Sequence, residues 1–438
     1  MKGVIVGGTR TGVGKTTVSL ALLKGLAAAG FTVQSFKAGP GFVDTRLHEA
    51  ITGQPCYNLD PFLMGEAGVK RELSKSTADF VVIEGGSGMY TGASSTARIA
   101  DLLDVPIVLT VDASASSESV AATALGFVRY ALYTPYDATV IGVVATRVGS
   151  DKHLDDIRSA LKKIGIPLFG VVRKEVWQKN QNRSAAPRKE SEIAETTLSA
   201  AYKELDIGLI SSGASELHLP VPEPSVRGDA GITVGIPLDA AFCFYYRSNL
   251  ESLELAANLE YFSPLIDRLP HVDALYLGGG YPEKHVQKLS QNVRLLDDIR
   301  EKAEQGMPIY AEGGGFAYLS RSLETADSAH YNLVGIIPAE VEVTTNLQAV
   351  GHSEVQVVRD CVIAMKGERL RGHEYHHSIA EVDRDVRFAF KMIRGTGING
   401  CDGITEYDTL ASFQHLHVYG MRDGFDTFLT TARRYARS

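Results

Sequence analysis

The chain is poor in the features that mark secreted, membrane-spanning or nucleic-acid-binding proteins. Its 438 residues include only four cysteines, Cys56, Cys243, Cys361 and Cys401, which form neither a CxxC pair nor a metal-ligand spacing. It has no run of about 18 apolar residues, and no basic and apolar leader precedes the first strand-like segment. Its 44 Lys and Arg against 52 Asp and Glu leave a net charge of -8 and no basic cluster. We therefore expect a cytoplasmic protein with reduced thiols and neither a membrane nor a nucleic-acid partner.

Strand-like segments alternate with helix-like stretches in both halves of the chain. The segments expected to be strands are 3–6, 32–36, 80–83, 107–111 and 139–144 in the first half, and 241–245, 274–277 and 309–311 in the second. Their β-branched residues without strict polar alternation are typical of parallel strands that are covered on both faces. A stretch rich in Gly, Ser and Pro at 210–230 predicts a boundary between two α/β domains, 1–215 and 230–438. The polar stretch 174–192 shows little apolar periodicity.

A glycine-rich loop follows the first strand candidate and leads into a stretch rich in Leu and Ala. The loop, Gly8-Thr9-Arg10-Thr11-Gly12-Val13-Gly14-Lys15-Thr16-Thr17, has five residues between its first and last glycines, one more than a strict Walker A motif. Its place between a strand and a helix favours a phosphate-binding P-loop over a glycine turn with a chance lysine. The residues expected to bind nucleotide are Thr11, Gly12, Val13, Gly14, Lys15, Thr16 and Thr17. Lys15 would neutralise the phosphates, and the Thr16 hydroxyl would hold Mg²⁺.

Three charged residues follow neighbouring strand candidates. Glu84 ends the third candidate, and Lys37 and Asp44 come just after the second. Ligands of parallel sheets bind at the carboxyl ends of the strands, so Glu84 is expected to share Mg²⁺ with Thr16, the alternative being a solvated acid. Lys37 could reach a phosphate or a substrate carboxylate. Asp44 could hold metal or substrate, although each of these two charges alone could be an ordinary surface residue.

Segments along nearly the whole chain match one enzyme family. The loop 8–17 is similar to a P-loop domain of the dethiobiotin synthetase type, and the stretch 36–44, followed by 47–48 and 58–61, is similar to the substrate-side segment of the same enzyme family. In the second half, the matching segments are 241–246, 277–283, 309–316, 371–376 and 415–417. On these segments the chain resembles the cobyrinic acid a,c-diamide synthases and their relatives that amidate nickel-sirohydrochlorin or sirohaem. The resemblance implies an N-terminal P-loop domain with a mainly parallel sheet and a C-terminal domain like class I glutamine amidotransferases.

The resemblance also implies a two-stage reaction with ATP and Mg²⁺ as cofactors. ATP would phosphorylate a side-chain carboxylate of a tetrapyrrole, and ammonia released from glutamine in the second domain would displace the phosphate. Lys15, Lys37 and Asp44 would act at the first step. Backbone N–H groups around Gly279 would form an oxyanion hole, and His415 would activate a thiol nucleophile. The family also suggests a homodimer.

The chain departs from the family's pattern at both sites. In the run Ile309-Tyr310-Ala311-Glu312-Gly313-Gly314-Gly315-Phe316, Gly313 stands where the family has its nucleophilic cysteine, so His415 would be a vestigial base. Gly41 replaces an aspartate, and Thr146 replaces an asparagine that reads adenine. The run Gly86-Ser87 replaces bulkier apolar residues, and an Arg-His-Leu-Gly-Leu segment is not visible.

Histidines near the C-terminus admit a second interpretation. His373 and His376 are three residues apart and would share one face if they lay on a helix, which, with His377, raises a metal site as an alternative. We favour a segment without metal. His415 and His417 alternate along a strand candidate, so both could face the Gly313 turn, with His415 the closer.

Three hypotheses remain open at this point. The first is an ATP-dependent ligase that amidates a tetrapyrrole acid with free ammonia or with ammonia from a partner protein. The second is a nucleotide-binding carrier, scaffold or regulator that no longer amidates. The third is a glutamine-dependent synthase with an engineered change at Gly313. Restoring cysteine at 313 would return glutamine use only if the rest of the pocket were intact.

Overall fold

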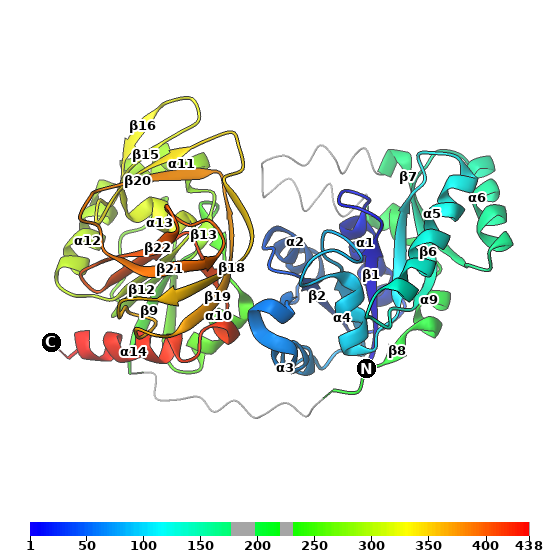
Figure 1. Ribbon diagram of the computed structural model, residues 1–438, viewed down its shortest axis with the longest axis horizontal. Coiled ribbons are helices and arrows are strands. Elements are labelled where there is room, and N and C mark those ends of the chain that lie inside the picture. The colour runs from blue at the N-terminus through cyan, green and yellow to red at the C-terminus, as the bar shows by residue number, and fades with distance from the viewer. Residues whose placement is uncertain (177–197, 220–230, 438) are drawn as a thin grey trace. The chain divides into compact units, whose positions relative to one another are not determined.

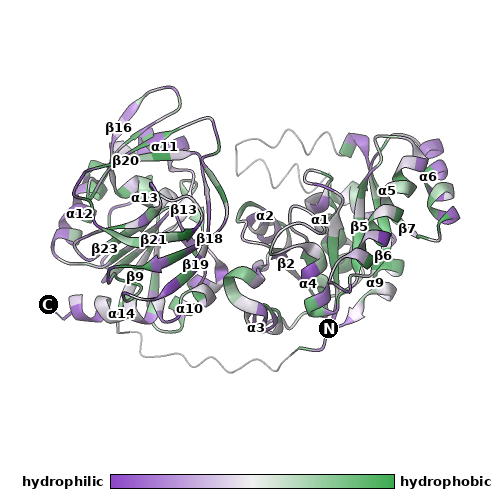
Figure 2. Cartoon of the chain, in the orientation of Figure 1, coloured by the Kyte–Doolittle hydropathy of each residue, from purple (hydrophilic) through white to green (hydrophobic). Residues whose placement is uncertain are grey.

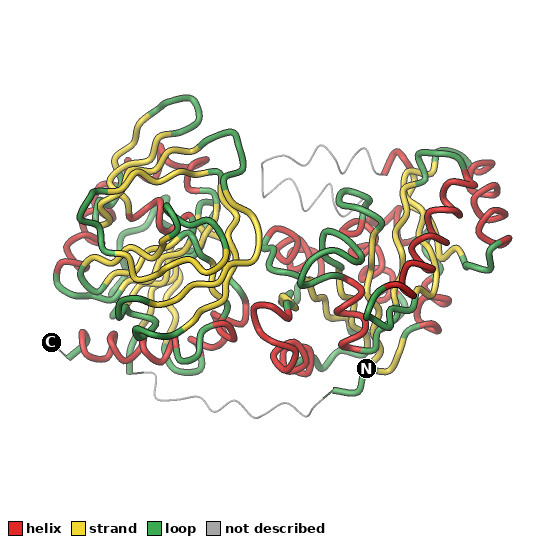
Figure 3. Tube along the Cα trace, viewed as in Figure 1, coloured by secondary structure: helices red, strands yellow, loops and turns green. Residues whose placement is uncertain are grey.

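The computed structural model describes residues 1–176, 198–219 and 231–437. The chain divides into two compact units, Met1–Glu223 and Pro224–Ser438. Both units combine helices with a large sheet, as the α/β pattern predicts (Figure 3). In the described parts of the chain, no helix has the length and apolar character that crossing a membrane requires.

The first unit is built on a parallel sheet with the strand order β3-β2-β4-β1-β5-β6-β7. Its strands are β1 (Lys2–Gly8), β2 (Val33–Ala38), β3 (Tyr57–Leu59), β4 (Phe80–Glu84), β5 (Ile107–Asp112), β6 (Val140–Val148) and β7 (Leu168–Arg173). A two-residue strand, β8 (Ser215–Glu216), pairs antiparallel with β1. The helices are α1 (Lys15–Ala28), α2 (Val43–Thr52), α3 (Pro61–Ser74), α4 (Thr96–Leu103), α5 (Ser117–Tyr130), α6 (Asp151–Lys163) and α9 (Ile207–Gly213).

The central strands of this sheet are buried along their length. Every residue of β4 is buried, and so are all residues of β1 after Gly3. Figure 2 shows hydrophobic strands in the middle of the unit and hydrophilic positions on the outer helix α6. The five predicted strands correspond to β1, β2, β4, β5 and β6, while β3 and β7 were not predicted. The predicted polar stretch 174–192 lies, from residue 177 on, outside the described residues.

The second unit carries a larger mixed sheet with the order β11-β9-β12-β14-β23-β22-β21-β18-β19-β24. Its strands are β9 (Thr233–Pro237), β11 (Asn258–Phe262), β12 (Ala274–Leu277), β14 (Ile309–Glu312), β18 (Ala349–Val357), β19 (Arg369–His376), β21 (Phe388–Arg394), β22 (Cys401–Glu406), β23 (Thr409–Ser412) and β24 (His415–Leu416). Pairing is parallel from β11 to β23 and antiparallel beyond.

Smaller elements complete the second unit. A four-stranded sheet contains β15 (Ser320–Glu324), β16 (His330–Asn332), β17 (Ile337–Val343) and β20 (Ser378–Val382), and a pair is formed by β10 (Phe242–Phe244) and β13 (Gly279–Gly280). The helices are α10 (Arg247–Glu254), α11 (Pro282–Gln291), α12 (Val293–Glu304), α13 (Gly314–Leu319) and α14 (Gly424–Tyr435) (Figure 1). The helical face proposed for His373 and His376 is wrong, because both residues lie on β19, where three-residue spacing puts them on opposite faces.

Candidate functional site

The P-loop turn connects β1 to α1 in the first unit. Gly12 and Gly14 have positive φ angles of 73° and 106°, and α1 begins directly after them at Lys15. Residues with a β-carbon rarely adopt such angles, so these two glycines allow the backbone to curl at the start of the helix. The first-turn N–H groups of a helix have no partner within that helix, which suits this turn to an anion.

Lys15 is buried at the base of this turn. Among the described residues, the one hydrogen-bond acceptor of its ammonium group is the carbonyl oxygen of Arg10, at 3.5 Å. Burial lowers the pKa of Lys15 and the nearby charge of Lys37 lowers it further, against the opposing effect of Glu84 and Asp44. A buried ammonium group with one long hydrogen bond is suited to receive a phosphate, because the anion would compensate its desolvation.

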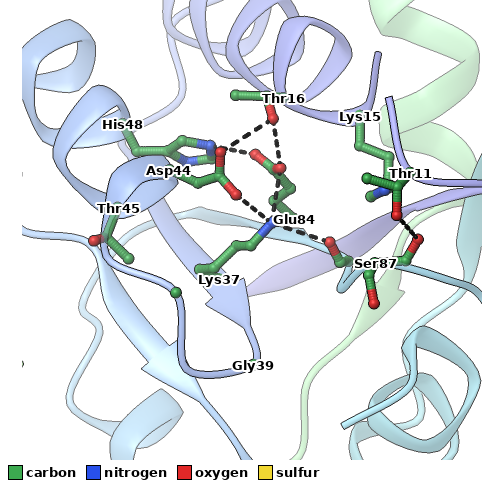
Figure 4. Close-up of polar contacts among 12 residues, drawn as sticks. Thr11, Lys15, Thr16, Lys37, Gly39, Asp44, Thr45, His48, Glu84 and Ser87 are labelled. Atoms are coloured by element: carbon green, nitrogen blue, oxygen red, sulfur yellow. Dashed lines mark hydrogen bonds and ion pairs between the residues drawn. The ribbon is translucent and has the colours of Figure 1, made fainter. Parts of the chain in front are cut away.

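Four side chains from three elements, α1, β2 and α2, gather around Glu84, the last residue of β4 (Figure 4). The Thr16 hydroxyl donates to Oε1 of Glu84 at 2.7 Å, and the Lys37 ammonium donates to the same oxygen at 2.9 Å. Lys37 also pairs with Oδ2 of Asp44 at 2.7 Å. On the other side, Nε2 of His48 contacts Oε2 of Glu84 at 2.7 Å. The sequence-predicted residues Thr16, Lys37, Asp44 and Glu84 therefore form one cluster.

The electrostatics of the cluster favour the charged forms of Glu84, Lys37 and His48. Burial opposes charge on Lys37, but Glu84 and Asp44 outweigh it and raise the pKa of Lys37. Burial likewise opposes charge on Glu84, yet Lys37 and His48 hold the pKa of this carboxyl well below its usual range. Burial lowers the pKa of His48, but Cys56 and Glu84 outweigh this effect and raise the pKa to about 10. The Glu84 carboxylate thus faces two cations, Lys37 and His48.

Sequence analysis included His48 in a segment that resembles the family's substrate side, but it predicted no role for this residue. His48 lies one turn after Asp44 on α2, and residues four apart share a helix face. Both side chains therefore point to the end of β4, Asp44 toward Lys37 and His48 toward Glu84. The spacing of an acid and a histidine on the helix after the Lys37 strand was the available signal.

The oxygen atoms in this cluster fit a magnesium ion. Mg²⁺ prefers hard oxygen ligands such as carboxylates and hydroxyls. The Thr16 hydroxyl lies 2.7 Å from Glu84 Oε1 and 3.4 Å from Asp44 Oδ1, so three oxygen-bearing groups converge. The Lys37 ammonium, which contacts both acids, shows that this point between the carboxylates accepts positive charge.

The structure shows the contacts of two residues that depart from the family pattern, Thr146 and Gly41. The Thr146 side chain is buried and donates to the carbonyl oxygen of Val13 at 2.8 Å, so it braces the P-loop from β6. Gly41 is exposed, and a β-carbon built on it would meet nothing within 4 Å. Its carbonyl oxygen and that of Gly39 accept hydrogen bonds from Asn58 at 2.9 and 2.8 Å, which hold this turn against β3.

The turn at Gly313 has the geometry of a nucleophile elbow without a nucleophile. It joins β14 to α13 with φ 50° and ψ -105°, which would strain any residue other than glycine. A β-carbon built on Gly313 would lie 2.6 Å from Nε2 of His415 and 2.8 Å from its Cε1. The space that a side chain would need at 313 is therefore filled by the imidazole of His415.

The surroundings of His415 are buried and polar. Nδ1 of His415 lies 3.6 Å from Oε2 of Glu312, and its ring stacks on His373 with the centroids 5.1 Å apart. Glu312, which sequence analysis did not single out, accepts hydrogen bonds from the hydroxyls of Tyr310 and Tyr276 at 2.5 and 3.1 Å. Glu312 directly precedes Gly313, and this position brings its carboxylate next to the His415 imidazole.

The glycine run that was expected to form an oxyanion hole lies at the same place. A β-carbon on Gly279 would be 2.5 Å from Cε1 of His415. A β-carbon on Gly314 would be 3.1 Å from the backbone nitrogen of Gly280. The run therefore borders both the elbow and His415. In the described residues, no group of three or more His, Cys, Asp or Glu side chains is arranged to hold a metal ion.

Alanine in place of Gly313 should destabilise the second unit more than the same change at a glycine in open space. Gly306, with φ 90° and nothing within 4 Å of an added β-carbon, is the matched control. Both replacements strain the backbone, at a cost of about 1–3 kcal/mol. Only Gly313→Ala must also displace the buried His415, so its midpoint of urea unfolding should fall further. Equal midpoints for the two variants would show that the space beside His415 is open.

Comparisons with known proteins cover both units. Residues 4–184 match the CobQ/CobB/MinD/ParA nucleotide binding domain, and residues 233–422 match the CobB/CobQ-like glutamine amidotransferase domain. A protein of Haloarcula marismortui named cobyrinate a,c-diamide synthase is 41% identical over 437 residues, 98% of each chain. Proteins with the same name from Halobacterium salinarum and Caldanaerobacter subterraneus are 41% and 34% identical, over 98% and 99% of this chain and 97% and 99% of their own. The chain therefore belongs to the cobyrinate a,c-diamide synthase family.

Proposed function

We propose that this protein is an ATP- and Mg²⁺-dependent ligase that amidates side-chain carboxylates of a cobyrinate-type tetrapyrrole, with ammonia instead of glutamine as its nitrogen source. The substrate class comes from full-length relatives that are named cobyrinate a,c-diamide synthase. The choice of ammonia depends on one observation, the His415 ring within 2.6 Å of a β-carbon built at Gly313. Position 313 has no thiol, and a side chain there would meet His415, so the residues at this position do not support glutamine hydrolysis.

The first step would transfer the γ-phosphoryl group of ATP to the acceptor. An oxygen of the carboxylate attacks phosphorus, the bond to ADP breaks, and an acyl phosphate forms. Lys15 would pair with the phosphates, since its ammonium group is buried beside the P-loop turn with one long hydrogen bond. Thr16, Glu84 and Asp44 are the groups that would hold Mg²⁺, which supplies charge neutralisation of the phosphates when bound.

The second step would form the amide. The nitrogen of ammonia attacks the carbonyl carbon, the bond to the phosphate oxygen breaks, and inorganic phosphate leaves while the nitrogen loses a proton. A carboxylate becomes reactive toward an amine only after this activation, because its oxygen is otherwise a poor leaving group. Lys37, at the carboxyl end of β2, would orient the acceptor carboxylate by charge. The ammonia would come from solution or from a partner protein.

Transfer of an oxygen label tests this function directly. Cobyrinate with ¹⁸O in its carboxylates is incubated with ATP, Mg²⁺ and an ammonium salt. If a carboxylate is phosphorylated and then displaced, each inorganic phosphate released should carry one ¹⁸O, and ADP, phosphate and amide should form in equal amounts. Release of unlabelled phosphate without amide would contradict a ligase and would favour the alternative, a nucleotide-hydrolysing carrier or regulator.

A further inference from the structure

The two oxygens of the Glu84 carboxylate have different surroundings. Oε1 receives the Thr16 hydroxyl at 2.7 Å and the Lys37 ammonium at 2.9 Å, so it faces the P-loop side of the cluster. Oε2 meets Nε2 of His48 at 2.7 Å. Glu84 is 1% exposed. One oxygen is thus available to a cation and the other is bound within the protein.

His48 is suited to a fixed role. It is 0% exposed, lies in the middle of α2, and cannot leave Glu84 without opening the packing around it. An ionised carboxylate only accepts hydrogen bonds, so Nε2 must carry the proton in this contact. The ring is held by its helix and has few torsions, which makes the contact a directional one.

Lys37 is suited to the opposite, exchangeable role. Its ammonium group is bound by oxygens of Glu84, Asp44 and the carbonyl of Gly85, at 2.9, 2.7 and 3.2 Å. A lysine ammonium group on a flexible four-carbon chain can move away when a stronger cation arrives, whereas a ring on a packed helix cannot. The geometry therefore separates a permanent partner of Glu84 from a temporary one.

The χ3 torsion angle of a glutamate side chain adopts a broad range of values. A buried carboxylate therefore keeps one orientation only if its neighbours impose it. Without His48, Oε2 would be left buried without its donor, and the carboxylate could turn to place both oxygens on Lys37. A carboxylate that chelates the lysine would be a poorer ligand for a divalent cation. His48 prevents this rotation by occupying Oε2.

We propose that His48 is a positioning residue that clamps Oε2 of Glu84, so that Oε1 stays directed at the divalent cation that accompanies the nucleotide. The proposal rests on the proposed function for the identity of the site, and it adds a residue that does not itself contact metal or substrate. It concerns the affinity for the cation and makes no use of the acceptor.

Two amide variants separate this role from a general structural one. In His48→Gln the amide nitrogen can reach the position of Nε2, whereas in His48→Asn it reaches only the position of Nδ1. Both variants are neutral, polar and capable of donating. Mn²⁺ binding to the full-length protein with ADP, followed by electron paramagnetic resonance, reports the cation site without any turnover.

We expect His48→Asn to weaken Mn²⁺ binding by about 10- to 100-fold, as loss of a residue that orients a metal ligand commonly does, and His48→Gln to stay within about threefold of the unmodified protein. Binding of a fluorescent ADP analogue in EDTA should change little in either variant. Equal Mn²⁺ affinity in His48→Asn and the unmodified protein would overturn the proposal, and so would an equal loss in both variants or loss of ADP binding in EDTA. Absence of amidation with normal Mn²⁺ binding would contradict only the proposed function.

Discussion

Replacing Lys15 with alanine should lower the rate of ADP formation in the presence of cobyrinate, Mg²⁺ and ammonium by about 100- to 1000-fold, the usual cost of removing one electrostatic contact to a transition state. Lys15 is buried beside the P-loop turn, and its one acceptor among the described residues is a carbonyl oxygen at 3.5 Å. Its ammonium group therefore contributes little to pairing within the protein and is suited to bind the phosphates.

Lys70→Ala is the control for this experiment. Lys70 is exposed on α3, so its removal should leave the rate unchanged. Because Lys15 makes little use of its charge within the fold, the thermal unfolding midpoint of Lys15→Ala should also stay close to that of the unmodified protein. A Lys15→Ala variant that is folded and retains most of its ADP formation would rule out the P-loop as the phosphate site.

The second large effect expected is in the nitrogen source. With saturating ATP and acceptor, amide formation from an ammonium salt should rise about tenfold per pH unit well below the pKa of ammonium, because the neutral amine is the nucleophile and its fraction rises in that proportion. Fresh glutamine freed of ammonia should give no amide. Amide counted by mass spectrometry at several pH values, with each nitrogen source separately, measures both results.

The pH profile should turn over at high pH. Burial lowers the pKa of Lys15, so this side chain loses its positive charge at a lower pH than an ordinary lysine does. Because the phosphates need the protonated form, kcat/KM for ATP should fall as Lys15 loses its proton, at a lower pH than an ordinary lysine would predict. A rate that continued to rise through this range would show that the Lys15 charge is not required.

Gly313→Cys extends the nitrogen-source experiment. A cysteine needs a β-carbon at a point 2.6 Å from Nε2 of His415, so the imidazole would have to move before a thiolate could act. We therefore expect the single substitution to leave glutamine unused and the ammonium-dependent rate unchanged. Glutamine-dependent amide from this variant would show that the pocket around the elbow still accepts the substrate of a glutaminase.

Local patterns predicted the elements that carry the site. The P-loop was recognisable because the strand, the glycine turn and the helix are contiguous in sequence, and β1 and α1 are found where these signals place them. The elbow was recognisable for the same reason, since β14, Gly313 and α13 follow one another directly. In these cases the backbone conformation depends on neighbouring residues, above all on glycines with positive φ.

Contacts between distant segments could not be read in this way. His48 and Glu84 are 36 residues apart, and their 2.7 Å contact depends on how α2 packs against the end of β4. The helical interpretation of His373 and His376 failed because the residues spaced for a helix lie on β19, where pairing with β18 and β24 decides the conformation. Pairing of strands is a property of the whole sheet.

Sequence alone was sufficient to predict a phosphate-binding turn at Lys15 and to show that position 313 lacks a thiol, because both depend on residue type and short-range order. The tertiary structure was needed to show that His415 lies where a β-carbon at position 313 would stand and that one oxygen of Glu84 contacts His48. Such facts depend on distances of a few ångströms between side chains from separate elements, and close packing is what brings those elements together.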